Sequence, residues 1–311
     1  MLSALGVVLP IFGLILAGYL CRKLGALGEN SAAELNRFVV RLALPALLFS
    51  IMAHTKWSDL DQPGFAAAFG LSGAIVFALT LLFRLRGAKS LADASLDGLN
   101  AGYANSGFIG LPLCLIVFGK DASPLATIAT IVTACVIFAI AIVLIEIGLQ
   151  KEQRPLALTL KVGGSLVRNP LLVAPVLGAA VAASGIALPG SVETFLKFLG
   201  DSASPCALVA LGLFLAQSKR PEKPVGGLAL SLVAVKLLLN PAIAWLLAGA
   251  AFRLSPGVVH VAVLISALPT GTGPFMLAEF YQREAATTSQ TILLSTIISV
   301  FTISAYLAWI R

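Results

Sequence analysis

The stretch "ANSGFIGLP", residues 104–112, interrupts an apolar run that is long enough to cross a membrane. It contains an asparagine, a serine, two glycines and a proline, which break or bend helices. A second such stretch, "ALPTGTGP" at residues 267–274, lies near the other end of the chain. A broken helix leaves backbone amides and carbonyls without partners, and hydrocarbon tolerates these groups only where they line a cavity or are buried in protein. These two stretches therefore point to a site.

The composition of the 311-residue chain indicates a membrane protein. Hydrophobic residues make up 59% of it and charged residues 11%, whereas soluble domains carry about 25% charged residues. The net charge of +7 does not indicate a nucleic-acid partner, because the basic residues fall in short loops between apolar runs. No cysteine or histidine has metal-ligand spacing, and no phosphate-binding loop is present. We therefore expect no metal, no cofactor and no enzymatic activity.

The apolar runs number ten, and each is near the roughly 20 residues that a helix needs to cross a bilayer. They cover residues 2–21, 32–53, 63–84, 94–118, 123–149, 162–184, 192–217, 227–252, 257–280 and 287–310. The sequence thus predicts an all-α membrane protein with ten transmembrane helices. The first run has no basic residues before it, which favours a span over a signal peptide.

The lysines and arginines predict the orientation of these spans. If the N-terminus is outside, twelve of them lie in inner loops and four on the outer side. The inner ones are Arg22, Lys23, Arg84, Arg86, Lys89, Lys151, Arg154, Lys161, Lys219, Arg220, Lys223 and Arg283; the outer ones are Lys56, Lys120, Arg253 and Arg311. Basic residues accumulate in cytoplasmic loops, so we expect both termini outside.

The two halves of the chain resemble each other when the second is shifted by 160 residues. "GALGENSAAELNRFVVRLALP" (25–45) then lies over "GIALPGSVETFLKFLGDSASP" (185–205). The matched pairs include Gly25 with Gly185, Ser31 with Ser191, Phe38 with Phe198 and Pro45 with Pro205. We expect one five-helix repeat at residues 1–149, a cytoplasmic linker at 150–161 and a second repeat at 162–311. Because five is odd, the second repeat enters the membrane from the opposite face.

Inverted repeats are typical of secondary transporters, whose substrates bind near the midplane on discontinuous helices in corresponding positions of the two halves. Spans four and nine, broken at Pro112 and Pro269, occupy such positions. Two half-helix N-termini there would offer free amides and partial positive charge, which suit an anion. The expected substrate-binding residues are Asn105, Ser106, Gly107, Gly110, Pro112, Pro269, Thr270, Gly271 and Thr272. A single break could be a proline kink in a packed helix, but a symmetric pair favours a site.

Three stretches resemble the auxin efflux carrier family, including its bacterial members and its plant carriers. They are "LNRFVVRLALPALLFSIMA" (35–53), "NSGFIGLPL" (105–113) and "ALPTGTGPFMLAEFY" (267–281). The ten-span layout matches the family over nearly the whole chain, but the long cytosolic loop of many plant carriers is missing. The chain therefore resembles a compact bacterial member.

The resemblance implies a fold with two crossed, proline-broken helices, at Pro112 and Pro269, with Asn105 seven residues before the first proline. It also implies a scaffold of spans one, two, six and seven, a mobile transport part made of the other spans, and a homodimer. Family members move malonate, malate or indole-3-acetate, so the implied substrate is a small organic carboxylate.

Charged residues inside the spans are further candidates. Lys236 lies about nine residues into span eight, and an intramembrane lysine is either a functional group or a snorkelling one. Asp201 in span seven could bind a proton or pair with a cation. His260 could titrate near neutral pH, but a lone histidine is more often structural. Arg37 and Arg41 share a helix face, and Glu34 lies three residues before Arg37. A local ion pair could form there, but snorkelling interfacial charges are the favoured interpretation.

We therefore expect a secondary carrier of a small organic carboxylate in a bacterial inner membrane, with the termini on the periplasmic side and an elevator-like mechanism. One alternative is a cation-coupled antiporter or symporter on a similar fold; the absence of adjacent intramembrane acids weakens it. Another is a membrane sensor that binds a ligand without flux. The sequence leaves the identity of the carboxylate, its direction and the coupling ion open.

Overall fold

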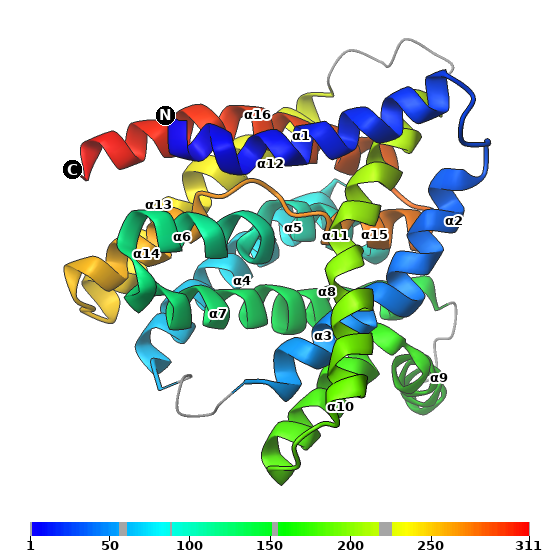
Figure 1. Ribbon diagram of the computed structural model, residues 1–311, viewed down its shortest axis with the longest axis horizontal. Coiled ribbons are helices and arrows are strands. Elements are labelled where there is room, and N and C mark those ends of the chain that lie inside the picture. Colours follow the sequence, from blue (N-terminus) through cyan, green and yellow to red (C-terminus); the bar gives the residue numbers. More distant parts are fainter. Residues whose placement is uncertain (1, 56–60, 88, 151–154, 218–225, 311) are drawn as a thin grey trace.

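The computed structural model describes residues 2–55, 61–87, 89–150, 155–217 and 226–310. Figure 1 shows that these ranges are built from helices. The helices of the first half are α1 (Leu2–Lys23), α2 (Ser31–Phe38), η1 (Val39–Ala43), α3 (Leu44–Ala53), α4 (Pro63–Arg86), α5 (Leu91–Gly102), η3 (Ser106–Gly110), α6 (Leu111–Phe118), η4 (Lys120–Ala122), α7 (Ser123–Ile131), η5 (Val132–Ile137) and α8 (Phe138–Leu149). Those of the second half are α9 (Pro155–Arg168), α10 (Pro170–Ser184), α11 (Gly190–Gln217), α12 (Gly227–Ala234), η6 (Val235–Leu239), α13 (Asn240–Trp245), η7 (Leu246–Ala251), α14 (Pro256–Ser266), α15 (Gly273–Phe280) and α16 (Ala285–Trp309).

Six helices of the described ranges are long and apolar enough to cross a membrane. They are Ser31–Ala53, Pro63–Arg86, Lys120–Leu149, Gly190–Gln217, Gly227–Ala251 and Ala285–Trp309. Three of these continuous helices, Ser31–Ala53, Lys120–Leu149 and Gly227–Ala251, contain π-helical turns, which widen a helix locally without ending it. Two shorter apolar helices, Ser106–Phe118 and Pro256–Ser266, adjoin the two breaks. The described chain is therefore multi-pass, with its expected fourth and ninth spans interrupted.

The expected sixth span differs from a straight helix. Leu160–Arg168 and Pro170–Ser184 together have the length and hydropathy of a span, but they meet at a 69° bend. Pro170 disfavours helical backbone at the residue before it, and the Asn169 side chain accepts a hydrogen bond from the Leu171 amide at 3.0 Å. Helix α9 also begins at Pro155, inside the segment expected to be a linker.

The helices pack as two bundles. In the first bundle (α1, α2, η1, α3, α10 and α11), α11 lies along α1, α2 and α3, and α10 packs on α3. In the second bundle (α4 to α8 and α12 to α16), α5 lies between α4 and α8, α13 packs on α14, and α12 packs on α16. Figure 1 shows α10 and α11 running across the direction of α7 and α16. The first bundle contains spans one, two and seven and the α10 part of span six, which the family resemblance groups as a scaffold.

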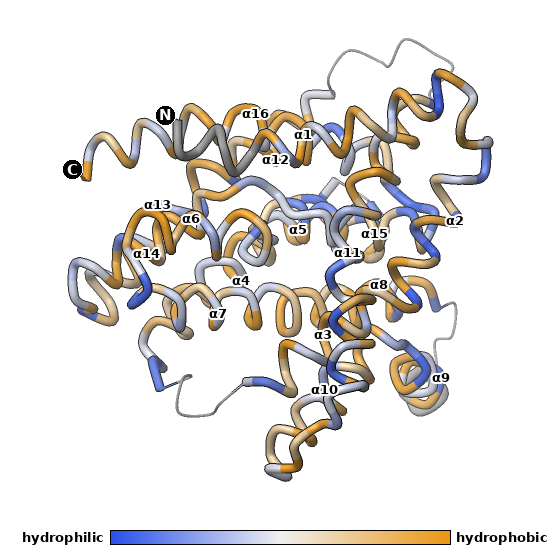
Figure 2. The backbone as a smooth tube through the Cα atoms, in the orientation of Figure 1, coloured by the Kyte–Doolittle hydropathy of each residue, from blue (hydrophilic) through white to orange (hydrophobic). Residues whose placement is uncertain are grey.

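The outer surface is strongly apolar. Figure 2 shows hydrophobic colouring over most of the helices, with hydrophilic colouring concentrated at helix ends and loops. Large side chains such as Phe83, Val176, Phe301 and Trp309 are exposed on several helices. Water would disfavour such a surface, whereas lipid would solvate it.

The ion pairs of the described residues include one that is buried and one that is exposed. Arg84 on α4 donates to Asp97 on α5 over 2.6 Å, and the carboxylate is fully buried. Removing one member of such a buried pair is strongly destabilising, because the other charge is left without a partner. On α2, Arg37 contacts Glu34 at 2.7 Å, which is the local pair that the sequence made possible.

Candidate functional site

The two helix breaks cross each other and are joined by backbone hydrogen bonds. The amide of Asn105 donates to the carbonyl of Pro269 at 3.0 Å, and the amide of Gly271 donates to the carbonyl of Tyr103 at 3.2 Å. Ala104 and Thr270 form an isolated antiparallel bridge between these bonds. Groups released by breaking each helix are thus satisfied by the other break, which reduces the cost of irregular backbone in a bilayer.

Glycine is required at the crossing for space. A Cβ on Gly271 would lie 2.8 Å from Cε1 of Tyr103, and a Cβ on Gly273 would lie 2.8 Å from Cζ of the same ring. A Cβ on Gly110 would lie 3.0 Å from a methyl group of Leu268. The tyrosine ring also packs against Phe138 of α8, with ring centroids 5.7 Å apart. The glycines therefore let the second break lie directly against the aromatic end of the first.

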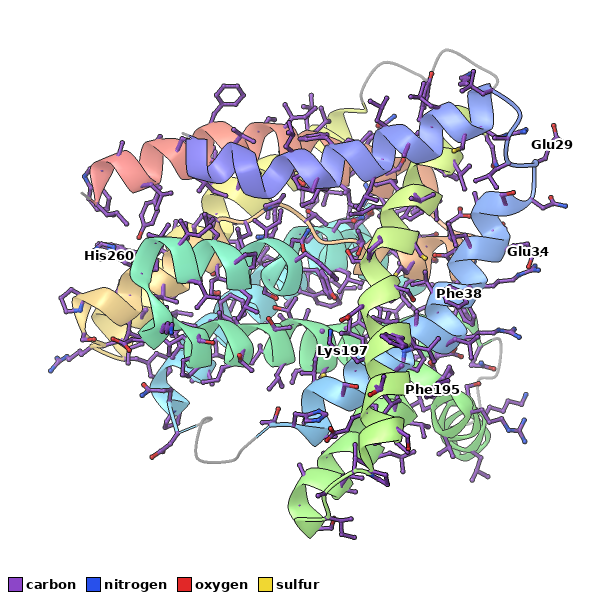
Figure 3. The ribbon with its side chains drawn as sticks, viewed as in Figure 1. Glu29, Glu34, Phe38, Phe195, Lys197 and His260 are labelled. Carbon is purple, nitrogen blue, oxygen red and sulfur yellow. The ribbon has the colours of Figure 1, made fainter. Side chains whose placement is uncertain are left out.

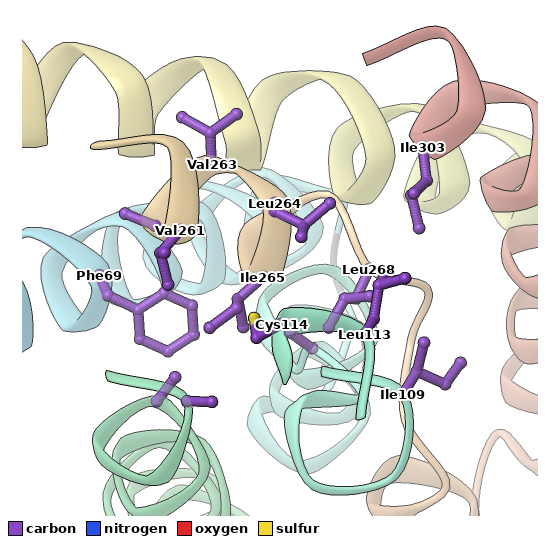
Figure 4. Close-up of a cluster of buried hydrophobic side chains, with 14 of the residues drawn as sticks. Phe69, Ile109, Leu113, Cys114, Val261, Val263, Leu264, Ile265, Leu268 and Ile303 are labelled. Carbon is purple, nitrogen blue, oxygen red and sulfur yellow. The ribbon is translucent and has the colours of Figure 1, made fainter. Parts of the chain in front are cut away.

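An apolar cluster fixes the half-helices behind the crossing. Figure 4 shows side chains of the first broken helix, including Leu113 and Cys114, packed against Leu264 and Ile265 of α14. Leu268, which precedes the second proline, belongs to the same cluster. In a bilayer, contacts of this kind are stabilised by close van der Waals packing between the helices. The two breaks therefore form one packed unit.

A cavity of about 380 Å³ lies at the crossing, between the two bundles. Its lining comes from α3 and α11 of the first bundle, and from α7, η5 and both breaks of the second. The residues are Leu44, Leu47, Leu48, Ile51, Tyr103, Ala104, Asn105, Ser106, Gly107, Phe108, Leu111, Thr127, Thr130, Ala134, Asp201, Ala203, Ser204, Gly271, Thr272, Gly273 and Met276. This is the size and mixed polarity of a small-molecule site.

Free hydrogen-bonding groups border this cavity. The Asn105 side chain is 7% exposed and makes no hydrogen bond within the described residues. In the same part of the chain, the amides of Gly107, Thr272 and Gly273 have no acceptor. An asparagine amide can both donate and accept, and free amides at helix N-termini favour negative charge. The arrangement can bind an anion without a formal positive charge.

Thr270 supports the crossing from behind and does not line the cavity. Its hydroxyl donates to the carbonyl of Asn100 at 2.8 Å, and its amide donates to the hydroxyl of Ser295 at 3.1 Å. The Asn100 side chain in turn donates to Thr288 on α16 at 2.9 Å. Buried polar networks of this kind rigidify the groups they join.

The structure brings together only part of the expected set of residues. Asn105, Ser106, Gly107, Gly271 and Thr272 line the cavity. The other four belong to the breaks but not to the lining; they are Gly110, Pro112, Pro269 and Thr270.

The three charged or titratable candidates lie in different places. Asp201 lines the cavity and pairs with Lys197 one turn earlier, with both side chains exposed. Lys236 lies outside the lining; it is fully buried and donates to the carbonyl of Ser266, the last residue of α14, at 2.6 Å. His260 contacts the hydroxyl of Tyr306 at 2.9 Å, and Figure 3 shows it at the edge of the molecule, away from Lys197.

Several site residues were not singled out in the sequence. Tyr103 immediately precedes the first break, and its position beside an asparagine and glycine stretch could have suggested it. Asn100 and Ser295 contact the second break from α5 and α16, and no local pattern marks them. They become visible only when the crossing brings distant segments together.

The loops next to the two broken helices are joined by charges. Arg283, after α15, contacts Asp93 at 2.7 Å, and Lys89, before α5, contacts Glu284 at 3.1 Å. Burial alone would raise the pKa of the Asp93 carboxyl, but hydrogen bonds from Ser90 and Arg283 outweigh it and hold this pKa below its ordinary value. The aspartate is therefore ionised and holds the two loops together.

Comparison with known proteins agrees with this architecture. A model of the family described as "Membrane transport protein" matches residues 3–307. A "Putative malonate transporter" of Rhizobium meliloti is 32% identical over 98% of this chain and 95% of its own length. An "Uncharacterized transporter" of Methanothermobacter thermautotrophicus is 29% identical over 94% of each chain. "Auxin efflux carrier component 8" of Arabidopsis thaliana is 21% identical over 96% of this chain and 94% of its own.

Proposed function

The chain belongs to the membrane transport protein family that includes the auxin efflux carriers, and we propose that it is a secondary transporter of a small organic carboxylate. The observation that carries this proposal is the cavity at the crossing. It combines the Asn105 side chain with amides of both breaks, and none of these groups has a hydrogen-bond partner in the described part of the chain. The names of two relatives support this substrate class. One is called a malonate transporter and the other an auxin efflux carrier, and malonate and auxin are both carboxylic acids.

The binding mode follows from the polar groups of the cavity. A carboxylate would accept hydrogen bonds from the Asn105 side chain and from amides at Gly107 and Thr272. Partial positive charge at the N-terminal ends of η3 and α15 would add to these bonds. Apolar residues of α3, such as Leu44 and Leu48, would contact the carbon skeleton. A single carboxylate satisfies the free donors, so this mode suits monocarboxylates and small dicarboxylates alike.

Lys236 would act on the other side of the second break, at the end of α14 that faces the start of α15. Its ammonium group lies at the carbonyl end of α14, where the helix dipole is negative, while substrate would lie near the N-terminal end of α15. The lysine would thereby supply a resident positive charge inside the second bundle. We propose that this charge offsets the buried carboxylate during transport, which reduces the cost of moving an anion through a medium of low dielectric constant.

The arrangement of the two bundles supports a transport mechanism in which one bundle moves against the other. We propose that ten spans, related as two inverted five-helix repeats, form a first bundle that stays fixed and a second bundle that carries the crossing. The cavity lies between the bundles, so displacement of one against the other would expose it to alternate sides. In the direction set by the lysines and arginines, both termini face the outside.

A cation-coupled antiporter remains the second mechanism to separate by experiment. An antiporter of this kind needs acidic groups that bind the cation at the site. Among the described residues of the cavity lining, the only carboxylate is that of Asp201, which is paired with Lys197. The cavity lining therefore favours an anion as the transported species.

Uptake into liposomes tests the proposed function. Purified protein would be reconstituted and given labelled malonate, malate or indole-3-acetate, with and without an imposed pH or sodium gradient. We expect saturable uptake of at least one acid and its loss in Asn105→Ala. Asn30→Ala is the matched control, because Asn30 is exposed before α2 and its side chain caps nothing. Uptake of cations without any acid would favour the antiporter, and wild-type uptake in Asn105→Ala would contradict the site.

A further inference from the structure

A second cavity, of about 840 Å³, shares no lining residue with the cavity at the crossing. It is bordered by η1 and α10 of the first bundle, by α8 and α15 of the second, and by α9, which contacts both α8 and α10. The lining residues are Arg41, Glu146, Gln150, Leu160, Lys161, Gly164, Ser165, Arg168, Asn169, Pro170 and Phe280. Both bundles therefore contribute to the lining of this cavity.

The charges of this cavity favour an anion. Arg41 and Arg168 come from different elements, and neither has a carboxylate partner within the described residues. Among the described residues, the lining contains one acid, Glu146, which accepts a hydrogen bond from the Tyr281 hydroxyl at 2.8 Å. Lys161 adds a third cation to the lining. Two guanidinium groups at one cavity are suited to bidentate contacts with phosphate oxygens.

Exposed apolar side chains also border this second cavity. Leu160 on α9 is 69% exposed and Phe280 on α15 is 38% exposed, and both belong to the lining. Val167, on α9 beside Arg168, is 76% exposed. A soluble anion would gain nothing from these surfaces, whereas acyl chains would cover them. The cavity thus has a charged part for a headgroup and an apolar edge for lipid tails.

Its position in the membrane agrees with this chemistry. In the orientation set by the lysines and arginines, the ends of α8 and α15 and the start of α10 face the cytoplasm. Basic pockets between helices on that side suit the headgroups of anionic lipids.

We propose that this cavity binds the phosphodiester headgroup of an anionic membrane lipid, such as phosphatidylglycerol, with Arg41 and Arg168 as its ligands. The lipid would contact both bundles and so restrict their relative displacement. This regulatory consequence rests on the proposed transport function, whereas lipid binding itself does not.

The binding test uses the whole protein and a matched pair of arginines. Wild type, the double variant Arg41→Gln/Arg168→Gln and the control Arg37→Gln would each be equilibrated in detergent with equal amounts of phosphatidylglycerol and phosphatidylcholine, and retained lipids would be counted by native mass spectrometry. Arg37 lies one turn before Arg41 but pairs with Glu34 and lies outside the cavity. We expect wild type and Arg37→Gln to retain phosphatidylglycerol preferentially. The double variant should retain about tenfold less phosphatidylglycerol than wild type, because it lacks charge-assisted hydrogen bonds to the headgroup.

Three results would overturn the proposal. They are equal retention of the two lipids by wild type, undiminished phosphatidylglycerol retention by the double variant, and displacement of the lipid by millimolar inorganic phosphate, which would indicate a site for the free anion. If the double variant does not fold, Arg168→Gln alone replaces it, because Arg168 is exposed.

Uptake separates this proposal from the transport proposal. In vesicles of pure phosphatidylcholine, the double variant should transport like wild type, and addition of phosphatidylglycerol should change the rate of wild type only. Asn105→Ala should lose uptake yet keep the lipid. A variant that loses uptake in both lipids would overturn the regulatory role, while loss of lipid with normal uptake in phosphatidylcholine would support the site.

Discussion

The amide of Asn105 donates to the carbonyl of Pro269, 164 positions later in the sequence, at 3.0 Å. The reciprocal bond from Gly271 to Tyr103 closes a short bridge, so each break supplies the partner that the other needs. A change in one break must therefore affect the other, and the substrate cavity between them depends on both. This coupling makes the geometry of the crossing testable through residues that need not touch substrate.

Gly271→Ala should impair transport by steric pressure on the first break. The added Cβ would lie 2.8 Å from the Tyr103 ring, and relief requires the ring or the backbone to move. Overpacking of this kind costs about 1–3 kcal/mol. We expect a lower thermal midpoint and lower uptake, measured on purified protein and in liposomes.

A second substitution identifies the cause. Tyr103→Ala removes the ring that the new Cβ would meet, so the double variant should be more stable than the sum of the single variants predicts. Additive losses of stability would mean that the ring is not the origin of the defect. Gly257→Ala is the control, because a Cβ there meets nothing within 4 Å.

The sequence predicted the helical membrane fold and the two breaks because their causes are local. Runs of apolar residues define spans, and proline with glycine interrupts a helix wherever it occurs. Asn105 and Thr272 could be placed at the cavity for the same reason. Thr270 could not be assigned its partner, because its hydroxyl and amide turn toward α5 and α16, and only tertiary packing determines that direction.

Other features depend on contacts that the sequence does not encode locally. The pairing of Arg84 with Asp97 joins two helices, and no local pattern shows which cation lies beside this intramembrane acid. The 69° bend between α9 and α10 follows from Asn169 and Pro170, yet hydropathy alone predicts a continuous run there. Lys236 was visible as an intramembrane charge, but its partner, a main-chain carbonyl, was not.

Gly18→Ala should destabilise the first bundle, whereas Gly13→Ala on the same helix should not. A Cβ on Gly18 would clash with the backbone carbonyl of Val209 on α11, while nothing lies within 4 Å of a Cβ on Gly13. Small residues allow membrane helices to approach closely. We expect Gly18→Ala to lose about 1–3 kcal/mol of stability, and Gly13→Ala to be neutral or to gain up to about 1 kcal/mol from helix propensity. Thermal unfolding in detergent measures both, and equal midpoints would contradict this packing.

Arg283→Gln should weaken the connection between the loops in a pH-dependent way. Because the pKa of folded Asp93 lies below its ordinary value, the ion pair stabilises the protein fully above the unfolded pKa of about 3.9 and loses its effect as pH falls through the folded pKa. The difference in thermal midpoint between wild type and variant should be constant from about pH 5 to 8 and shrink below about pH 4. Since Arg283 is partly exposed, the effect should not exceed about 1 kcal/mol. A difference that grew with acidification would be incompatible with this pair.

Replacement of Lys236 tests whether the second bundle requires a resident cation. Lys236→Met keeps most of the side-chain volume but removes the charge and the bond to the Ser266 carbonyl. A buried carbonyl without a partner costs about 1–3 kcal/mol, so the variant should fold with a lower thermal midpoint. We expect uptake of carboxylates to fall far more than this loss of stability explains, because the anion then has no offsetting charge.

Lys236→Ala extends this test, because it leaves a space into which a small amine can enter. Ethylammonium should partly restore uptake in Lys236→Ala but not in Lys236→Met, where the methionine occupies that space. The exposed Lys120, in the turn before α7, provides the control Lys120→Met, which should transport like wild type. Full uptake by Lys236→Met would show that the lysine only caps the carbonyl end of α14. Uptake by Lys236→Ala that is restored by sodium instead of the amine would show that an inorganic cation can occupy the position the ammonium group fills in the native protein.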